Sequence, residues 1–298
     1  MILVTGAGRG LGKAYATLLA ERGASVIVAD NGSTMGGEST ATAPADDVAA
    51  AIRAAGGRAI SCTADLAQEA GAGEAITTAL DAFGRIDGII HNASTVPELA
   101  GPDRLSTPDL DFVLRINVHA GLWLARAAWP HFVKRGYGRM VLTSSAAIYG
   151  AEGNMSYAAA KAASIGMMRC LAVEGRAAGI MVNAVAPSAS TRMTERHLVS
   201  DYAQWFHQTM QPEKVAAAVA YLMHDTCAIN GEILAIGGGR IARVVLGESR
   251  GAMSHEDSIE AVAMAMPEVV AQQDVFYPTD LAERSSTVAR MFAVDGNR

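Results

Sequence analysis

A tyrosine and a lysine four positions apart are the residues of this chain best suited to acid–base chemistry. Tyr157 and Lys161 lie in the segment SYAAAK, whose spacing predicts that both side chains share one face of a helix. A phenol is a poor base near neutral pH because its reference pKa is about 10, but a neighbouring ammonium favours the phenolate. The pair is therefore a candidate for proton transfer to or from a bound hydroxyl group.

Polar residues upstream could assist such a transfer. The fifth apolar run ends in Ser144 and Ser145, where a serine hydroxyl could hydrogen-bond a substrate oxygen and polarise a carbonyl. Asn117, in the segment RINVHAG, falls in the middle of a predicted helix, although asparagine is a poor helix former. Asn92 follows the fourth apolar run and is a candidate for lining a ligand cleft.

A glycine-rich segment near the start of the chain has the properties of a phosphate site. Residues 5–12 read TGAGRGLG, directly after a strand-like run and before a segment with helical spacing. Glycine lets the backbone approach a pyrophosphate closely, and a helix N-terminus offers free N–H groups and a positive dipole end. A strand before and a helix after the motif predict dinucleotide binding. The residues expected to bind the dinucleotide here are Gly6, Arg9, Gly10, Leu11 and Gly12.

The second strand-like run ends in an acidic side chain, Asp30. An acid at this place can bond a ribose 2′-hydroxyl and repel a 2′-phosphate. Arg9 favours the opposite choice, because an arginine in the glycine loop can pair with a 2′-phosphate. Since Asp30 would face that phosphate directly, the sequence predicts NAD rather than NADP. Asp65 and Leu66 follow the third run and are expected to border the adenine.

Apolar runs that alternate with helical segments position these residues. The expected strands are 2–5, 25–30, 59–63, 86–91, 139–145, 181–186 and 233–236, and the expected helices are 11–22, 46–55, 73–83, 109–134, 156–176 and 213–223. Strands that are apolar throughout have both faces covered, and alternation with helices implies a parallel sheet. We therefore predict a Rossmann-type, doubly wound α/β fold of about seven strands over residues 1–240. Residues 241–298 form a C-terminal extension with helical patterning near 256–266.

Composition excludes several classes of protein. The 298 residues are 50% hydrophobic and 18% charged, which argues against disorder, and no apolar run is long enough for a membrane helix. Net charge is −6 with lysine and arginine scattered singly, so no nucleic-acid partner is expected. The three cysteines and seven histidines show no ligand spacing, so no metal site is expected. The chain starts on a strand-like run without a leader, which predicts a cytoplasmic protein.

Together these motifs resemble the short-chain dehydrogenase/reductase family. The resemblance implies an enzyme that transfers a hydride between a nicotinamide cofactor and a secondary alcohol or ketone. It implies that Tyr157 is the general acid/base and that Lys161 lowers its pKa and binds ribose. It further implies that a serine orients the substrate and that Asn117 holds a water linking Lys161 to solvent. The further cofactor contacts implied by the family motifs are Asn92, Ala93, Tyr157, Lys161 and Pro187.

Three features depart from the family pattern. The usual Asn-Asn-Ala-Gly reads HNAS at 91–94, so that Ser94 replaces a glycine that lets the cofactor approach. The usual Pro-Gly after the sixth strand has Ser188 in place of glycine. The family interval back from Tyr157 gives Ser144 as the orienting serine, whereas counting along the strand gives Ser145. We expect Ser145, because length differences fall in loops.

Within the family the chain is similar to the branch with the (3R)-hydroxyacyl-CoA dehydrogenase part of peroxisomal multifunctional enzyme type 2. The segments that carry this likeness include VTGAGRGLGKAYA at 4–16, RAAWPHFVKRGYGRMVLTSSAAIYG at 126–150 and GGGRIARVVLGESRGAMSHED at 237–257. The branch implies a 3-hydroxyacyl-CoA substrate, a homodimer or homotetramer, and an extension packed on the core or on the partner subunit. The alternatives are a hydroxysteroid or other bulky secondary-alcohol dehydrogenase, and an NAD(H)-binding protein without turnover.

Overall fold

The computed structural model describes residues 1–34, 36–38, 43–96, 98–195, 201–252, 256 and 258–295. The chain divides into two compact units, Met1–Arg243 and Val244–Arg298. The first unit holds every residue that the sequence assigns to chemistry or to cofactor binding.

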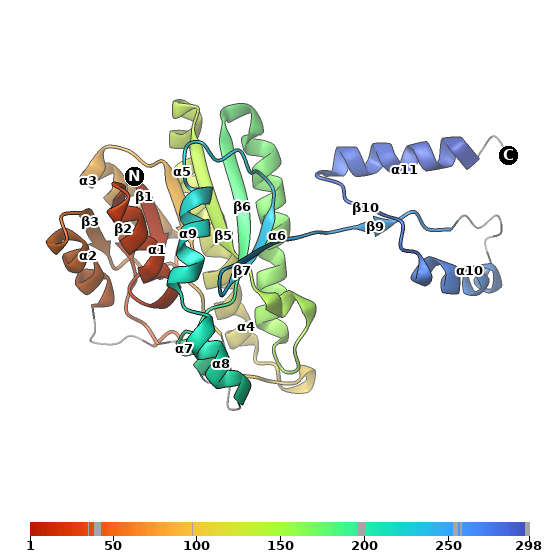
Figure 1. The fold of residues 1–298 in the computed structure, drawn as a ribbon, viewed down its shortest axis with the longest axis horizontal. Helices are drawn as coiled ribbons and strands as arrows, with labels where there is room; N and C mark the ends of the chain where they lie inside the picture. The colour runs from red at the N-terminus through yellow and green to blue at the C-terminus, as the bar shows by residue number, and fades with distance from the viewer. Residues whose placement is uncertain are drawn as a thin grey trace. The chain divides into compact units, whose positions relative to one another are not determined.

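An eight-stranded sheet forms the centre of the first unit (Figure 1). Its strands are β1 Ile2–Thr5, β2 Ser25–Ala29, β3 Arg58–Cys62, β4 Gly88–His91, β5 Gly138–Thr143, β6 Ile180–Pro187, β7 Ile233–Gly237 and β8 Arg240–Val244. They lie in the order β3-β2-β1-β4-β5-β6-β7-β8, and the pairings from β3 through β7 are parallel. Strand order reverses between β1 and β4, where a ligand crevice is expected at the carboxyl ends.

Helices cover both faces of the sheet (Figure 1). They are α1 Gly10–Glu21, α2 Pro44–Ala54, α3 Glu69–Phe83, α4 Thr107–Leu114, α5 Ala120–Arg135, α6 Met155–Gly175, α7 Arg192–Glu195, α8 Asp201–Thr209 and α9 Glu213–Leu222. The helices α1, α2 and α9 share one apolar core with side chains of the strands, among them Val4, Val28 and Val141. The strands β1, β2, β4 and β5 are buried along their whole length, which explains why they carry apolar residues on both faces.

The predicted doubly wound α/β fold is confirmed, with two differences in detail. The sheet has an eighth strand, β8, which the sequence reading places in the extension rather than in the sheet. The helical region expected at 109–134 is a pair, α4 and α5, joined by a π-helical turn at Arg115–His119. A π turn inserts one extra residue into a helix and is frequent at functional sites. Asn117 lies in the middle of that turn.

The second unit, Val244–Arg298, holds two short antiparallel strands and two helices. These are β9 Glu248–Ser249, β10 Val275–Phe276, α10 Ile259–Ala271 and α11 Leu281–Asp295. The Ser258 hydroxyl caps α10 by accepting the Ala261 N–H at 3.1 Å, and Arg284 pairs with Glu248 at 2.7 Å. The expected helix near 256–266 is therefore present as α10, whereas α11 is a helix that the sequence reading did not foresee. Nowhere in the described part of the chain is a helix both long and apolar enough to span a membrane.

Candidate active site

The turn between β1 and α1 runs so close to its surroundings that only glycine fits. Gly6 has a φ of 62°, and a Cβ at this position would lie 2.9 Å from the Ala93 Cα. A Cβ on Gly12 would lie 2.2 Å from the Gly6 carbonyl oxygen. Contacts below 3 Å are repulsive, so a side chain at either position would force the turn apart. The first helical turn of α1 therefore begins directly behind β1, with N–H groups that lack partners within the helix.

The chain after β4 is tied to this turn by hydrogen bonds. The Thr5 hydroxyl accepts the backbone N–H groups of Asn92 and Ala93 at 3.0 and 2.9 Å. The Asn92 side-chain amide donates to the carbonyls of Thr5 and Gly6 at 3.1 and 3.2 Å. Asn92 and Ala93 thus lie beside the glycine turn. The side-chain amide of Asn92 stabilises the conformation of this turn through its two hydrogen bonds.

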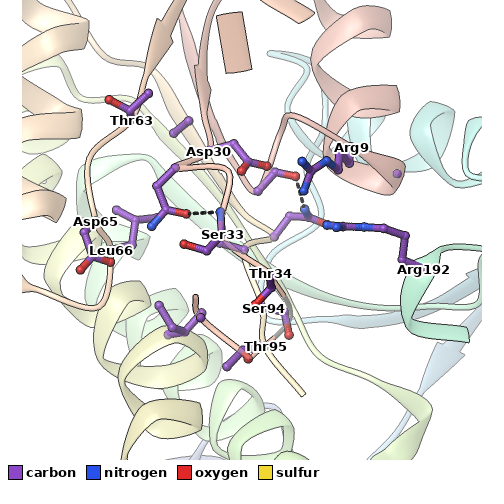
Figure 2. A pocket seen from close by; sticks show the side chains of 18 of the residues that line it. Arg9, Asp30, Ser33, Thr34, Thr63, Asp65, Leu66, Ser94, Thr95 and Arg192 are labelled. Atoms are coloured by element: carbon purple, nitrogen blue, oxygen red, sulfur yellow. Dashed lines mark hydrogen bonds between the residues drawn. The ribbon is translucent and has the colours of Figure 1, made fainter. Parts of the chain in front are cut away.

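Asp30 is fixed by the backbone on both of its carboxylate oxygens. Gly8 N–H donates to Oδ2 at 3.0 Å and Gly32 N–H donates to Oδ1 at 2.9 Å. The carboxylate therefore has a defined orientation at the end of β2, with lone pairs left for further donors. In Figure 2 it lies on the same side of the pocket as Arg9 and Arg192, while Asp65 and Leu66 lie on the other side.

A cleft of about 730 Å³ opens at the carboxyl ends of these strands. Nine of the residues predicted to bind the dinucleotide line it: Gly6, Arg9, Gly10, Leu11, Asp30, Asp65, Leu66, Asn92 and Ala93. The sequence reading missed Ser33, Thr34 and Gly37 from the loop after β2, Phe112 and Ile116 from the α4 region, and Thr191 and Arg192 from the chain after β6. Gly12, Tyr157, Lys161 and Pro187, which were also predicted, are not among the lining residues described for this cleft.

Tyr157 lies near the beginning of α6 with its phenol among hydroxyl groups. Its side chain is buried, which raises the pKa of the phenol, while the hydroxyl groups of Ser145 and Ser94 lower that pKa in part. The Ser145 hydroxyl accepts the Ala147 N–H at 3.1 Å, which leaves the hydrogen of Ser145 available to the phenol or to a substrate oxygen. Two serine hydroxyls therefore favour the ionised form of the tyrosine, against the effect of its burial.

Lys161 lies beneath the same tyrosine, with 2% of its surface exposed. Its Nζ donates to the Thr143 carbonyl at 2.9 Å and lies 5.4 Å from the centre of the Tyr157 ring. Burial lowers the pKa of the Lys161 ammonium to about 7. The Ser144 hydroxyl donates to the Lys161 backbone carbonyl at 2.8 Å and so is directed at the helix backbone. Ser145 therefore stays the predicted orienting serine, because the Ser144 hydroxyl is engaged with the helix.

Asn117 is buried in the π turn with its amide orientation fixed by its neighbours. Its Nδ2 donates to the carbonyls of Thr95 and Val113 at 3.2 and 2.9 Å. Its Oδ1 accepts the Ser94 hydroxyl at 2.6 Å. Asn117 is thus held at the cleft wall by Ser94, which lines the cleft. The sequence reading had named Ser94 as a departure from the family pattern, without a link to either residue.

His91, the other departure in that segment, connects β1 to the π turn. Its Nδ1 lies 3.2 Å from the Thr5 hydroxyl and its Nε2 lies 3.1 Å from the Ile116 carbonyl. Because that hydroxyl already accepts two N–H groups, its hydrogen points to Nδ1, and Nε2 carries the proton that reaches Ile116. Burial, followed by the charge of Lys161, lowers the pKa of His91 to about 4. The ring is therefore neutral near physiological pH.

The cleft fits a dinucleotide on the evidence of its own residues. The backbone approaches without side chains at the glycine turn, a helix N-terminus faces the same region, and a fixed carboxylate ends β2. Pro187, the last residue of β6, is half-buried at the same end of the sheet. Among those that are described, no cluster of three or more metal-ligating side chains occurs.

Comparison with known proteins agrees with this geometry. The family model described as short chain dehydrogenase matches residues 1–200. A protein named as a short-chain type dehydrogenase/reductase of Mycobacterium tuberculosis is 40% identical over 271 residues, which are 90% of this chain and 93% of that protein. Peroxisomal multifunctional enzyme type 2 of Mus musculus is 42% identical over 82% of this chain, which is only 32% of that enzyme. The solved full-length enzyme of that name from Drosophila melanogaster matches with a TM-score of 0.80 and 28% identity, over 98% of this chain and 49% of that one.

Proposed function

The chain belongs to the short-chain dehydrogenase family and is an oxidoreductase that acts on CH–OH groups, and we propose that it uses NAD to oxidise a 3-hydroxyacyl-CoA to the 3-oxoacyl-CoA. The observation that carries the proposal is the buried pair of Tyr157 and Lys161, whose Nζ lies 5.4 Å from the centre of the phenol ring, together with a cleft that nine predicted dinucleotide residues line. The likeness to multifunctional enzyme type 2 supports the choice of substrate class.

In the proposed reaction the nicotinamide cofactor, when bound, accepts the hydride from the carbinol carbon. The chain handles the proton: Tyr157 in its phenolate form takes the hydroxyl hydrogen, and Ser145 donates to the same substrate oxygen and orients it. The Lys161 ammonium favours the phenolate by its charge. Asn117 is proposed to support the movement of that proton towards solvent. The reaction releases one ketone and one proton for each hydride transferred.

The choice of NAD over NADP rests on Asp30. Its carboxylate is held by Gly8 and Gly32, so it cannot turn away from a phosphate placed on the adenosine ribose. A 2′-hydroxyl would donate to the free lone pairs, whereas a 2′-phosphate would meet a fixed negative charge. Arg9 and Arg192 line the same cleft and can counter part of that repulsion. We assign the selection to Asp30 because its orientation is set by two hydrogen bonds.

A substrate panel tests the proposal. Purified protein is given NAD together with (3R)- and (3S)-hydroxyacyl-CoA esters of several chain lengths and with hydroxysteroids, and nicotinamide reduction is followed. We expect turnover of the (3R)-hydroxyacyl-CoA esters, and a loss of at least about 10²-fold in the Tyr157→Phe variant, which keeps NAD binding. Turnover of steroids alone would replace the substrate class. NAD binding without any turnover would favour the alternative of a cofactor-binding protein.

The assembly and location expected from the sequence stay predictions. We propose a homodimer or homotetramer, in which residues 241–298 pack on the core or on a partner subunit. Analytical sedimentation of the full chain and of a chain ending at residue 240 would test both points. A cytoplasmic location likewise stays a prediction, because relatives that share this segment are named as peroxisomal.

A further inference from the structure

His91 connects two turns that belong to different parts of the site. The residue is 4% exposed, its Nδ1 lies 3.2 Å from the Thr5 hydroxyl oxygen, and its Nε2 lies 3.1 Å from the Ile116 carbonyl oxygen. Thr5 ends β1 and leads into the glycine turn, whereas Ile116 precedes Asn117 in the π turn. One buried side chain therefore contacts both the turn expected to bind the dinucleotide and the turn that carries Asn117.

The polarity of this connection follows from counting hydrogens. The Thr5 hydroxyl accepts the N–H groups of Asn92 and Ala93, so both of its lone pairs are used and its single hydrogen is directed at Nδ1 of the imidazole. Nδ1 is therefore an acceptor, and Nε2 carries the hydrogen that the Ile116 carbonyl accepts. Burial, which lowers the pKa of His91 to about 4, keeps the ring in the neutral form that this arrangement requires.

A glycine in α5 leaves the space that the imidazole occupies. A Cβ on Gly121 would lie 3.2 Å from Cδ2 of His91 and 3.0 Å from Cε of Met167, a residue of α6. These distances are shorter than the optimal separation of about 3.5–4.0 Å between carbon atoms, so even a methyl group at position 121 would press on the ring. The imidazole thus packs directly against the backbone of α5, which limits its movement away from its two hydrogen-bond partners.

The bond to Ile116 favours the π form of the turn over a regular α-helix. In an α-helix the Ala120 N–H would bond the Ile116 carbonyl, but here it bonds the Arg115 carbonyl. The Ile116 carbonyl is thereby released from Ala120 and accepts Nε2 of His91 instead. Relaxation of the turn into an α-helix would rotate the residues on one side of it by about 100° relative to the other side, since each helical residue turns by that angle. Asn117 would then leave its present partners.

The length of the side chain decides which residue can make both bonds. The amide of an asparagine ends where Nδ1 lies, so its oxygen could accept the Thr5 hydrogen but its nitrogen would not reach the Ile116 carbonyl. The amide of a glutamine ends where Nε2 lies, so it could donate to Ile116 but would offer no acceptor to Thr5. Of the three, histidine alone places an acceptor at the first position and a donor at the second. The asparagine that is usual in the family motif would therefore leave the two turns unconnected.

We propose that His91 is a positioning residue for both turns: it stabilises the glycine turn through Thr5, and it stabilises the π form of the turn around Asn117 through Ile116. The inference rests on the proposed function, in which the glycine turn binds NAD and Asn117 supports the movement of the proton. Each end of the imidazole then has a separate effect. The bond at Nδ1 raises the affinity for the cofactor, and the bond at Nε2 raises the rate of the chemical step.

Two amide variants separate these effects. His91→Asn keeps an acceptor for Thr5 and loses the bond to Ile116, whereas His91→Gln keeps a donor for Ile116 and loses the bond to Thr5. Asn183→Ala is the control. Asn183 is also a buried strand residue, and its side chain makes two hydrogen bonds with the backbone of another segment, at 2.8 and 3.1 Å. It is not among the described residues that line the cleft.

Three quantities are measured in the parent chain and in each variant. They are the dissociation constant of NAD by calorimetry, kcat at saturating NAD with an alcohol of the panel, and amide hydrogen exchange of peptides covering residues 4–13 and 112–121. The exchange measurement needs no turnover, so it reports on the two turns independently of the reaction.

We expect His91→Asn to lower kcat by about 3- to 10-fold, the effect of one buried hydrogen bond, and to leave the NAD dissociation constant unchanged. We expect His91→Gln to raise that constant by about 3- to 10-fold and to leave kcat unchanged. Exchange should become faster in 112–121 for His91→Asn and in 4–13 for His91→Gln. Asn183→Ala should lower the unfolding temperature and alter none of the three quantities.

Equal changes in the two His91 variants would overturn the proposal, as would changes of the same kind in Asn183→Ala, because they would show a general loosening of the fold. Parent values in both His91 variants would overturn it as well. If no alcohol of the panel is turned over while NAD affinity and exchange separate as expected, the role of His91 is upheld and the proposed function is refuted.

Discussion

Replacement of Asp30 by asparagine tests the cofactor assignment with almost no change of shape. In the parent chain the Gly8 N–H donates to Oδ2 at 3.0 Å and the Gly32 N–H donates to Oδ1. The asparagine amide has one oxygen, which can accept the Gly32 N–H. Its NH2 group then faces the Gly8 N–H, and that N–H loses its acceptor. An unsatisfied buried N–H costs about 1–3 kcal/mol, so a modest loss of stability accompanies the substitution. Thermal unfolding of the variant measures this loss separately from cofactor choice.

The electrostatic effect on NADP follows from the lost charge. A carboxylate and one phosphate charge about 5 Å apart repel by roughly 3 kcal/mol at an effective dielectric constant of about 20. Since about 1.4 kcal/mol is a factor of ten, the ratio of kcat/KM for NAD to that for NADP should fall about 10²-fold in Asp30→Asn. Part of this change is lost affinity for NAD, because the ribose hydroxyl exchanges a charged acceptor for a neutral one.

Asp65→Asn is the matched control. Asp65 lines the same cleft and also holds a backbone N–H, that of Ala67 at 3.0 Å, so its substitution removes an equal charge from another part of the site. Initial rates with NAD and with NADP, measured for the parent and for both variants, give the NAD-to-NADP ratio of kcat/KM in each protein. The reasoning fails if the parent prefers NADP, or if the two substitutions change the NAD-to-NADP ratio equally.

Three further substitutions test the packing and the buried charges. Gly12→Ala places a Cβ 2.2 Å from the Gly6 carbonyl and should cost about 1–3 kcal/mol of stability and abolish NAD binding, whereas Gly166→Ala, which meets no neighbour, should do neither. Burial holds the pKa of Lys161 at about 7, below its ordinary 10.5. Between these two pH values the unfolded state binds more protons than the folded state, so the free energy of unfolding rises with pH. Urea unfolding at several pH values should show a smaller rise in Lys161→Met than in the parent chain. The pKa of His91 is about 4, against an ordinary value of 6.5, so the free energy of unfolding decreases as the pH falls from 6.5 to 4. Urea unfolding should show a smaller decrease in His91→Asn than in the parent chain. An equal decrease in the variant and the parent would contradict this prediction.

Local sequence signals predicted the parts of the site that lie on one element. The glycine turn, Asp30 and the Tyr157–Lys161 pair each follow from spacing within a strand–turn–helix unit, and nine of the predicted dinucleotide residues line the cleft. The strands β1, β2, β4 and β5 were recognisable because they are buried along their whole length and carry apolar residues on both faces. The helical region predicted at 109–134 is wrong only at the π turn. The helices on both sides of the turn have the same periodicity, so the sequence pattern does not mark the inserted residue.

Local sequence signals could not predict which residues of distant segments line the cleft together. Ser33 and Thr34 line the cleft because they follow the carboxyl end of β2, and Thr191 and Arg192 line it because they follow the carboxyl end of β6. No periodic pattern marks these positions. A polar loop directly after a parallel strand is the signal that could have identified them, because the carboxyl ends of all such strands converge.

The two departures from the family motif at 91–94 both hydrogen-bond the π turn. The neutral imidazole of His91 donates to the backbone carbonyl of Ile116, and Ser94 donates to the side chain of Asn117, the next residue. A π turn departs from the regular hydrogen-bond pattern of an α-helix, and here two side chains supply bonds to it. His91 is in turn oriented by Thr5, which also holds the glycine turn. Hydrogen bonds therefore connect Thr5 through His91 to Ile116, and Ser94 bonds the next residue, Asn117, so that a change at either departure alters the surroundings of the π turn.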